Sequence, residues 1–184
     1  TSIRKRSTMG MSHIPEDRHK HGLVLDYSLE DNMVLQRYFE PEFTDKAGFL
    51  RRKNIRGYAE RLIEQYDVRS GQGPVTIARS MSGGNQQKVV IGKWLATHPE
   101  VIILDEPTKG IDIGSKAAVH QFMSELVSQG LAVIMVSSEL PEVMGMADRI
   151  IVMHEGLMVA EYRAGEATAE TIVSAASGIG QEAA

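Results

Sequence analysis

The spacing of apolar positions predicts a chain that mixes short buried strands with amphipathic helices. Apolar runs bounded by turn residues, typical of buried parallel strands, lie at 11–14, 101–104 and 131–136. Apolar residues at helical spacing predict helices at about 28–38, 51–66, 83–97, 114–129, 139–147 and 167–176. The runs at 149–153 and 157–162 flank a turn at Glu155-Gly156 and predict a hairpin. A strand, a helix and a strand over 101–136 predict a parallel pair with a right-handed connection.

One predicted helix begins with small residues. Ser82, Gly83 and Gly84 lie at the start of the helix expected at 83–97, whose apolar face is predicted to be Val90, Ile91, Trp94 and Leu95. A helix start has free N–H groups and the positive end of the dipole, and glycine lets an anion approach the backbone closely. The stretch therefore predicts an anion site.

A pair of acids ends the second predicted strand. Asp105 and Glu106 follow Val101–Leu104 and precede Pro107. In open α/β sheets the carboxyl ends of the strands face the ligand crevice. One of the two carboxylates is placed to hold Mg²⁺ through water, and the other to orient or deprotonate an attacking water.

Together these stretches resemble the ATP-binding cassette (ABC) ATPases. Met81-Ser82-Gly83-Gly84-Asn85 is similar to their signature, Asp105-Glu106 to Walker B, and Lys109-Gly110-Ile111-Asp112 to the D-loop. Each piece alone is weak, and a serine helix cap followed by an unrelated strand is the alternative. The resemblance covers residues 11–162 and implies an α/β, P-loop-NTPase-like fold. Such a fold has a parallel sheet flanked by helices, an inserted helical subdomain, and a C-terminal β-hairpin plus helix.

The expected organisation has four parts. They are an N-terminal strand with the loop after it (1–25), a helical subdomain (26–80), the signature helix with the Walker B and D-loop core (81–162), and a C-terminal helix and tail (163–184). The helical subdomain is expected to contact membrane subunits. Its aromatic residues and Met33 are predicted to be core rather than contact surface.

The resemblance also implies site roles. Cassettes act as face-to-face pairs, so the signature would serve ATP held by the partner, through Ser82, Gly83, Gly84, Asn85 and Gln86. Asp105 would hold Mg²⁺ and Glu106 would polarise water in this cassette's own site. Asp112 would set the dimer contact. Glu16, in a predicted loop over 15–23, stands where the family carries a glutamine that senses Mg²⁺ and touches the transporter. Ser138 stands at the position of the switch histidine, so this cassette's own site is predicted to be slow or silent.

The loop that normally wraps the phosphates is not found in these 184 residues. No Gly-x-x-x-x-Gly-Lys-Ser/Thr pattern occurs, and in the family this loop precedes the position of Glu16. The expectation is a piece of a longer polypeptide, with a naturally short relative as the alternative. By itself the chain is expected not to hydrolyse ATP, because positioning supplies most of the catalysis in phosphoryl transfer.

The Pro15-Glu16-Asp17-Arg18 run resembles the second cassette of sugar and nucleoside importers. The resemblance implies ATP and Mg²⁺ as cofactors, and a second ABC cassette and transmembrane permease subunits as partners. An extracytoplasmic substrate-binding protein would act indirectly. The implied location is the cytoplasmic face of the plasma membrane. A non-catalytic interaction module and a soluble, non-transport ABC ATPase remain alternatives. Residues 26–80 lack the sustained heptads of chromosome- or repair-type cassettes.

Composition narrows the choice further. The formal charge is −4, which argues against nucleic acid as a partner and against a ribosome-bound cassette. There is no cysteine, so disulfides and thiolate metal sites are excluded. Arg4, Lys5 and Arg6 predict a solvated tail rather than a binding site. His19 and His21 lack a nearby third metal ligand.

Overall fold

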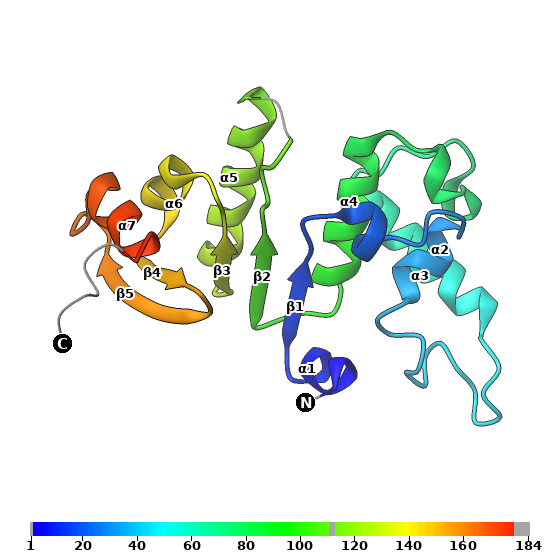
Figure 1. Ribbon diagram of the computed structural model, residues 1–184. Helices are drawn as coiled ribbons and strands as arrows, with labels where there is room; N and C mark the ends of the chain where they lie inside the picture. Colours follow the sequence, from blue (N-terminus) through cyan, green and yellow to red (C-terminus); the bar gives the residue numbers. More distant parts are fainter. Residues whose placement is uncertain (1, 111–112, 179–184) are drawn as a thin grey trace. The chain divides into compact units, whose positions relative to one another are not determined.

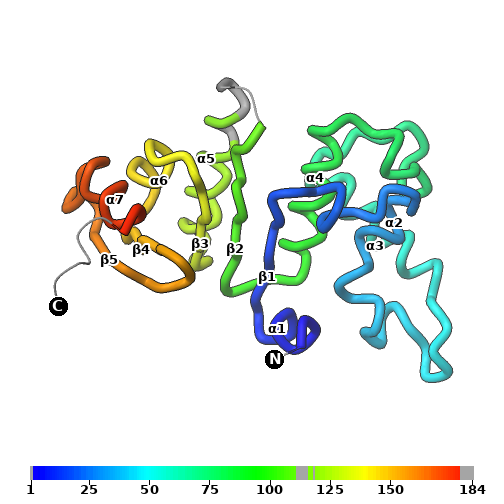
Figure 2. Tube along the Cα trace, in the orientation of Figure 1, coloured from blue at the N-terminus to red at the C-terminus, as the bar shows by residue number. Residues whose placement is uncertain are grey.

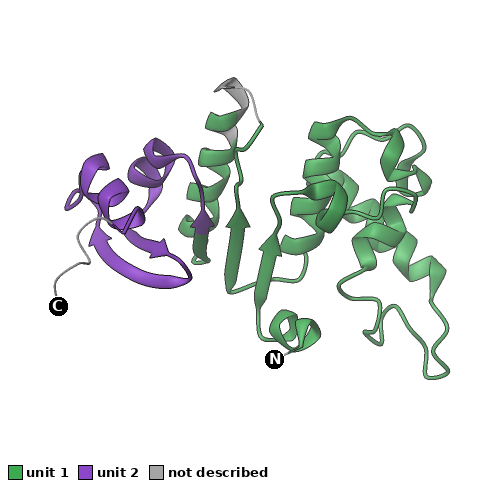
Figure 3. Cartoon of the chain, viewed as in Figure 1, with its two compact units in different colours: residues 1–134 green, residues 135–184 purple. Residues whose placement is uncertain are grey.

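The structure is a computed structural model that describes residues 2–110 and 113–178, apart from the side chains of residues 113–115 and 118. It divides into two compact units, Thr1–Ile134 and Met135–Ala184 (Figure 3). The division falls inside a strand. Each unit is described by itself.

Helices and strands alternate along the chain, as Figures 1 and 2 show. The strands are β1 (Met11–Ile14), β2 (Val101–Asp105), β3 (Ala132–Val136), β4 (Arg149–His154) and β5 (Leu157–Arg163). The α-helices are α1 (Ile3–Thr8), α2 (Leu29–Val34), α3 (Arg52–Gln65), α4 (Gly83–Leu95), α5 (Ile113–Ser128), α6 (Leu140–Met146) and α7 (Ala169–Ala176). Three short turns of π- or 3₁₀-helix complete the set: η1 (Arg18–Gly22), η2 (Gly73–Val75) and η3 (Ala78–Ser80).

A three-stranded sheet with the order β1-β2-β3 confirms the predicted α/β class. β1 and β2 are parallel, with Met11 opposite Val101 and Ile14 opposite Leu104. The carbonyl of Gly10 accepts the N–H groups of Glu100 and Val101 at 2.8 and 3.0 Å, which fixes this register at the amino ends. Because the strands are parallel, the segments that follow Ile14 and Leu104 leave from the same edge of the sheet.

The helical region packs around its own apolar core. Met33 and Phe43 are fully buried, and the ring of Phe43 lies 4.9 Å from that of Tyr58. The prediction that the aromatic residues here are core is correct for these but wrong for Tyr27, Tyr38 and Phe49, which are exposed. These three lie in turns and loops, where no helical face turns the ring inward.

Helix α2 ends earlier than predicted, at Val34 rather than near Tyr38. Its start is as expected, because the Ser28 hydroxyl accepts the N–H of Asp31 at 3.1 Å. After Val34 the backbone bonds change to i→i−3 turns, in which the N–H of Arg37 reaches the carbonyl of Val34. The chain therefore tightens into turns before Pro41.

Two stretches predicted to be irregular are helical. Residues 3–8 are solvated as predicted, since none is buried, but they form the helix α1, with the hydroxyl of Ser2 accepting the N–H of Lys5. The predicted loop over 15–23 contains the π-helical turn η1, in which Asp17 accepts the N–H groups of His19 and Lys20 at 2.9 and 3.0 Å. Local side-chain caps, rather than apolar periodicity, form both turns.

Helix α4 buries a different face from the one predicted. Val90 is buried as expected, but Ile91, Trp94 and Leu95 are only half-buried. The other fully covered side chains on α4 are Val89, Gln86 and Lys93. Lys93 is 2% exposed, and its ammonium donates to the carbonyl of Gly22 at the end of η1.

The second unit is built on the predicted hairpin. β4 and β5 are antiparallel, with Arg149 opposite Arg163 and His154 opposite Leu157. The core of this unit is Ile150, Val152 and Ile172, so α7 packs on the hairpin. The threonine pair Thr168 and Thr171 caps α7 reciprocally.

Replacing Lys93 by methionine tests the cost of burying this ammonium. Burial lowers the pKa of Lys93 to about 8, whereas a lysine in an unfolded chain titrates near 10.4. The folded state therefore releases the proton first, and the unfolding free energy of the parent chain rises between about pH 8 and pH 10.5 by about 1–3 kcal/mol. Lys93→Met should lack this rise.

Urea unfolding of both proteins at pH 7.5, 9 and 10.5 measures the difference. A parallel pH dependence in the two proteins would contradict the assignment.

Candidate functional site

The serine-glycine stretch lies at the start of α4, as predicted. Ser82 is the N-cap residue with extended backbone, and Gly83 is the first helical residue. Ser82 and Gly84 are exposed, while Gly83 and Asn85 are half-buried. The first backbone N–H groups of this 13-residue helix have no intrahelical acceptor and lie at the surface.

The Ser82 hydroxyl is held away from those N–H groups. It makes no hydrogen bond to the backbone of α4, and instead accepts the side-chain amide of Asn85 at 3.0 Å. The amide oxygen of Asn85 accepts the N–H of Arg69 at 2.8 Å. Ser82 and Asn85 thus form a small fixed unit beside the helix start.

Gln86 differs from the rest of the stretch, because it points into the protein. It is 5% exposed, accepts from His19 Nε2 at 2.8 Å and donates to the carbonyl of Ala78 at 2.9 Å. A direct contact between Gln86 and a nucleotide would require these bonds to break. In this structure it joins α4 to η1 and η3.

Sequence reasoning missed Arg18. A Cβ on Gly83 would lie 3.0 Å from Arg18 Nη2, so the guanidinium occupies the space beside the start of α4. Arg18 Nε is buried without a hydrogen-bond acceptor. A positive charge here adds to the attraction of the helix dipole for an anion. The sequence offered one indication of this role, because Arg18 directly follows Asp17, the residue that caps η1.

The acid pair lies at the carboxyl end of β2. Asp105 is the last residue of the strand and is half-exposed, with its Oδ2 3.8 Å from His13 Nε2 on β1. Glu106 follows with a φ of 47°, in the left-handed region that few residues with a side chain adopt. Its carbonyl accepts the N–H of Lys109 at 3.1 Å, which closes the turn that holds this conformation.

Glu16 reaches the same edge of the sheet from the end of β1. Its Oε1 accepts from Lys109 Nζ at 2.7 Å. The pKa of Lys109 is raised by this hydrogen bond and by the charge of Glu16, with smaller contributions from Glu106 and Asp105. The structure therefore gathers Glu16, Asp105 and Glu106 around one ammonium. The role of Lys109 was not predicted, although it belongs to the D-loop stretch.

These carboxylates fit a magnesium ion in part. Mg²⁺ in phosphate sites is held by one or two carboxylates together with waters and phosphate oxygens. Asp105 and Glu16 are hard oxygen donors at the ends of neighbouring parallel strands. Among residues 2–110 and 113–178, no three His, Cys, Asp or Glu side chains form a complete metal site. The chain thus offers donors whose remaining ligands would be a nucleotide and water.

Ser138 and Asp112 are the remaining predicted site residues. Ser138 is exposed and belongs to the second unit. Its neighbour Ser137 donates to Glu142 at 2.6 Å and accepts the N–H of Glu139 at 3.0 Å, so the turn into α6 is fixed locally. Asp112 lies outside the described residues.

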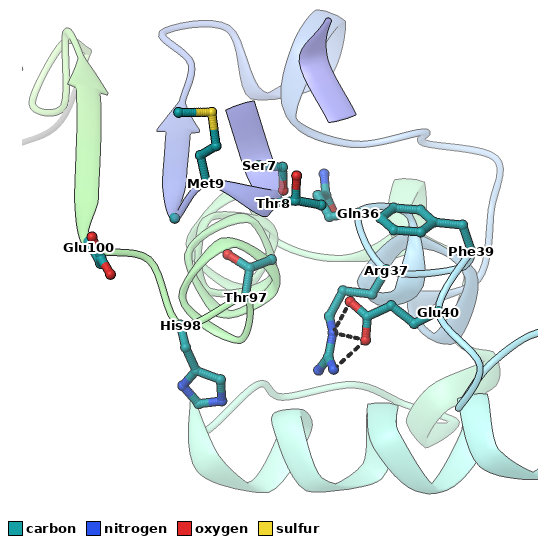
Figure 4. A pocket seen from close by; sticks show the side chains of 11 residues that line it. Ser7, Thr8, Met9, Gln36, Arg37, Phe39, Glu40, Thr97, His98 and Glu100 are labelled. Carbon is teal, nitrogen blue, oxygen red and sulfur yellow. Dashed lines mark hydrogen bonds and ion pairs between the residues drawn. The ribbon is translucent and has the colours of Figure 1, made fainter. Parts of the chain in front are cut away.

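A cavity of about 410 Å³ lies in the first unit at the opposite ends of β1 and β2 (Figure 4). It is lined by residues from 7–10, 36–40 and 97–100. Arg37 forms a two-pronged ion pair with Glu40, which raises the arginine's pKa above its usual value. The Oε1 of Gln36 is buried without a donor. Because the acid pair lies at the carboxyl end of β2, this cavity is a separate feature.

Comparison with known proteins identifies the family. A family model described as "ABC transporter" matches residues 3–109, which is more than half of the chain. The chain belongs to the ABC transporter family. The family model ends at Lys109, so it includes both the start of α4 and the acid pair.

Curated relatives are subunits of sugar importers. The chain is 53% identical over 169 residues to the ribose import ATP-binding protein RbsA 1 of Agrobacterium fabrum, which covers 92% of the chain and 32% of the relative. It is 55% identical over 174 residues to the ribose import ATP-binding protein RbsA of Roseobacter denitrificans, with the same coverage. The cassette described here thus spans about a third of the length of these relatives.

Solved structures confirm the predicted fold. A nucleotide-free ATP-binding cassette from an ABC transporter matches with a TM-score of 0.67 and 18% identity, over 95% of this chain and 68% of that one. A cassette in its ADP conformation matches with a TM-score of 0.65 and 21% identity, over 96% of this chain and 68% of that one. No helix in the described residues is long and apolar enough to cross a bilayer.

Alanine substitutions test whether packing requires glycine at the start of α4. A Cβ on Gly84 would meet no atom within 4 Å, and the same holds for Gly57 in α3. Both Gly84→Ala and Gly57→Ala should raise the unfolding free energy, by about 0.5–1 kcal/mol each, because alanine loses less backbone entropy in a helix. Thermal and urea unfolding measure this. Destabilisation by Gly84→Ala alone would mean that packing, not ligand approach, needs the glycine.

Proposed function

We propose that this chain is part of the nucleotide-binding cassette of a sugar importer, and that it acts in a face-to-face pair with a second cassette. The observation that carries the proposal is the Ser82-Gly83-Gly84 start of α4, where Ser82 and Gly84 are exposed, in the same unit as the strand-end acids Asp105 and Glu106. The helix start suits a phosphate group, and the acid pair suits a metal ion and a water molecule. ATP and Mg²⁺ are the proposed cofactors.

The start of α4 serves ATP held by the partner cassette. Free N–H groups, the helix dipole and the nearby Arg18 favour a negatively charged phosphate. The Ser82 hydroxyl accepts a hydrogen bond from the Asn85 side chain, so its own proton can be donated to a phosphate oxygen. Donors fixed in advance stabilise charge that develops during phosphoryl transfer. Asp112, which follows the acid pair in the sequence, would supply the dimer contact.

The acid pair serves this cassette's own site. Bound Mg²⁺ supplies charge neutralisation on the phosphates. Asp105 would hold it through water, Glu16 would accept from a second metal-bound water, and Glu106 would orient the attacking water. Ser138 offers one uncharged hydroxyl in place of a histidine. The two ATP sites of the cassette pair would therefore differ in rate. Hydrolysis would be fast in the partner's site, which α4 completes, and slow in this cassette's own site.

The names of the relatives, ribose import ATP-binding proteins, support a proposal about the transported substrate. We propose a pentose sugar such as ribose, with a nucleoside as the second choice. The transporter would include permease subunits and, indirectly, an extracytoplasmic binding protein. The cassette would sit at the cytoplasmic face of the plasma membrane as a peripheral subunit.

The cavity of Figure 4 is the proposed docking place for a permease segment. It joins the core segments 7–10 and 97–100 to the helical segment 36–40, so an inserted residue would contact both. The buried oxygen of Gln36 lacks a donor that an incoming N–H or O–H group would supply. Arg4 stacks 4.4 Å from the ring of Phe39 and holds α1 against the same segment.

Two substitutions rank the roles of the sites. Ser82→Arg should abolish ATPase activity of the assembled transporter, because a large cation fills the phosphate position at α4. Glu106→Gln should lower activity only partly, because it affects the slower site. Steady-state ATPase assays of both variants measure the ranking, and the reverse order would refute the division of labour.

The purified 184-residue chain alone serves as the control, and no turnover is expected from it because its sequence lacks the phosphate-wrapping loop. Binding of an ATP analogue by the partner cassette, with and without this chain, separates an enzyme half, which should tighten the binding, from a non-hydrolysing interaction module, which should leave it unchanged.

Introduced cysteines test the docking place, since the chain has no cysteine of its own. Ser7→Cys and Glu40→Cys, at the cavity, should cross-link to a permease subunit in the assembled transporter. Glu60→Cys, on the exposed side of α3, should not. Mass spectrometry of the cross-linked product identifies the permease residue. Equal cross-linking at all three positions would contradict a specific site.

A further inference from the structure

Glutamate at position 16 has a fixed basic partner. Lys109 Nζ lies 2.7 Å from Glu16 Oε1, although 93 positions separate them in the sequence. We propose that Lys109 competes with Mg²⁺ for Glu16 and thereby lowers the metal affinity of this cassette's own site. Lys109 is thus a positioning residue, and its proposed role rests on the metal site proposed above.

Three carboxylates place negative charge near Lys109. They are Glu16, Asp105 and Glu106 at one edge of the sheet, and the charge of each raises the pKa of Lys109. A glutamine at position 16 would be neutral and would not need a cation. A glutamate needs either a metal or a basic side chain to offset its charge at this edge. Lys109 supplies that charge when no metal is present.

Lys109 and a metal ion would use the same carboxylate. Lys109 Nζ donates to Oε1 of Glu16, and a magnesium-bound water would donate to the same carboxylate group. Two cations beside one carboxylate repel each other, so metal binding displaces the ammonium. The metal affinity therefore includes the free energy of breaking this ion pair.

The effect should be modest. The side chains of Lys109 and Glu16 are 59% and 46% exposed, and such ion pairs open readily in water. Removing the ammonium should tighten metal binding about three- to tenfold at low ionic strength. A completely blocked site would need a buried pair.

Manganese binding by the full-length protein together with a non-hydrolysable ATP analogue, which supplies the phosphate ligands, tests the proposal, with Mn²⁺ as a paramagnetic substitute for Mg²⁺ read by electron paramagnetic resonance. Lys109→Met should bind Mn²⁺ about three- to tenfold more tightly than the parent. Lys109→Arg, which keeps the ion pair, should bind like the parent. In a Glu16→Gln background, Lys109→Met should change the affinity by less than about twofold.

Lys88→Met is the matched control. Lys88 Nζ also lies 2.7 Å from a carboxylate oxygen, that of Asp67, and this pair is exposed too. Neither side chain belongs to the acid cluster around Lys109. Removing this ammonium lowers the net charge equally but should leave Mn²⁺ affinity unchanged. Asp105→Asn locates the bound ion, because it should weaken binding in every background.

Four results of the Mn²⁺ measurements would contradict the role of Lys109 or the metal site itself. Equal tightening by Lys88→Met and Lys109→Met would reduce the effect to net charge and overturn the inference. Tightening that persists in the Glu16→Gln background would show that Lys109 does not act through Glu16, which also overturns it. If neither the parent nor Lys109→Met binds Mn²⁺, the metal site of the proposed function fails and the inference with it. Binding by the parent with no change in Lys109→Met refutes the inference alone.

Discussion

The parallel pairing of β1 with β2 is the constraint on which the candidate site depends. It places the residue after Ile14 and the residue after Leu104 at one edge of the sheet, although the two strands are far apart in sequence. Glu16 and Asp105 become neighbours only through this pairing. A slip of β1 by one residue would turn His13 from the more open face, which it shares with Asp105, toward the buried face that Ser12 and Ile102 occupy.

The segment from Glu16 to Gly22 connects the edge of the sheet to the signature helix α4. Its first residue binds Lys109 beside the acid pair, and its later residues contact α4 through Gln86 and Lys93. Gly22 packs against Val90, with no room for a larger side chain without displacement of its neighbour. The acid cluster and the phosphate-facing helix start thus share one short covalent connection.

Apolar periodicity predicted the strands and most helices, because each of these elements buries a face whose period appears in the sequence. It failed where polar atoms decide the conformation. Asp17 and Ser2 form caps that fold two stretches predicted to be irregular. Lys93 and Gln86 are buried because each finds a hydrogen-bond partner on a distant segment. The signature and acid pair were predicted from their residue pattern, whereas Arg18 and Lys109 depend on tertiary contacts that no spacing encodes.

The contact of Arg18 with Gly83 limits how these two positions can vary in evolution. The guanidinium of Arg18 occupies the space beside α4 that a side chain at position 83 would need. A side chain at 83 would require a small shift of the flexible end of Arg18, whereas a shorter residue at 18 would leave room for it. A side chain at position 83 is therefore expected mainly in relatives whose residue at 18 is small.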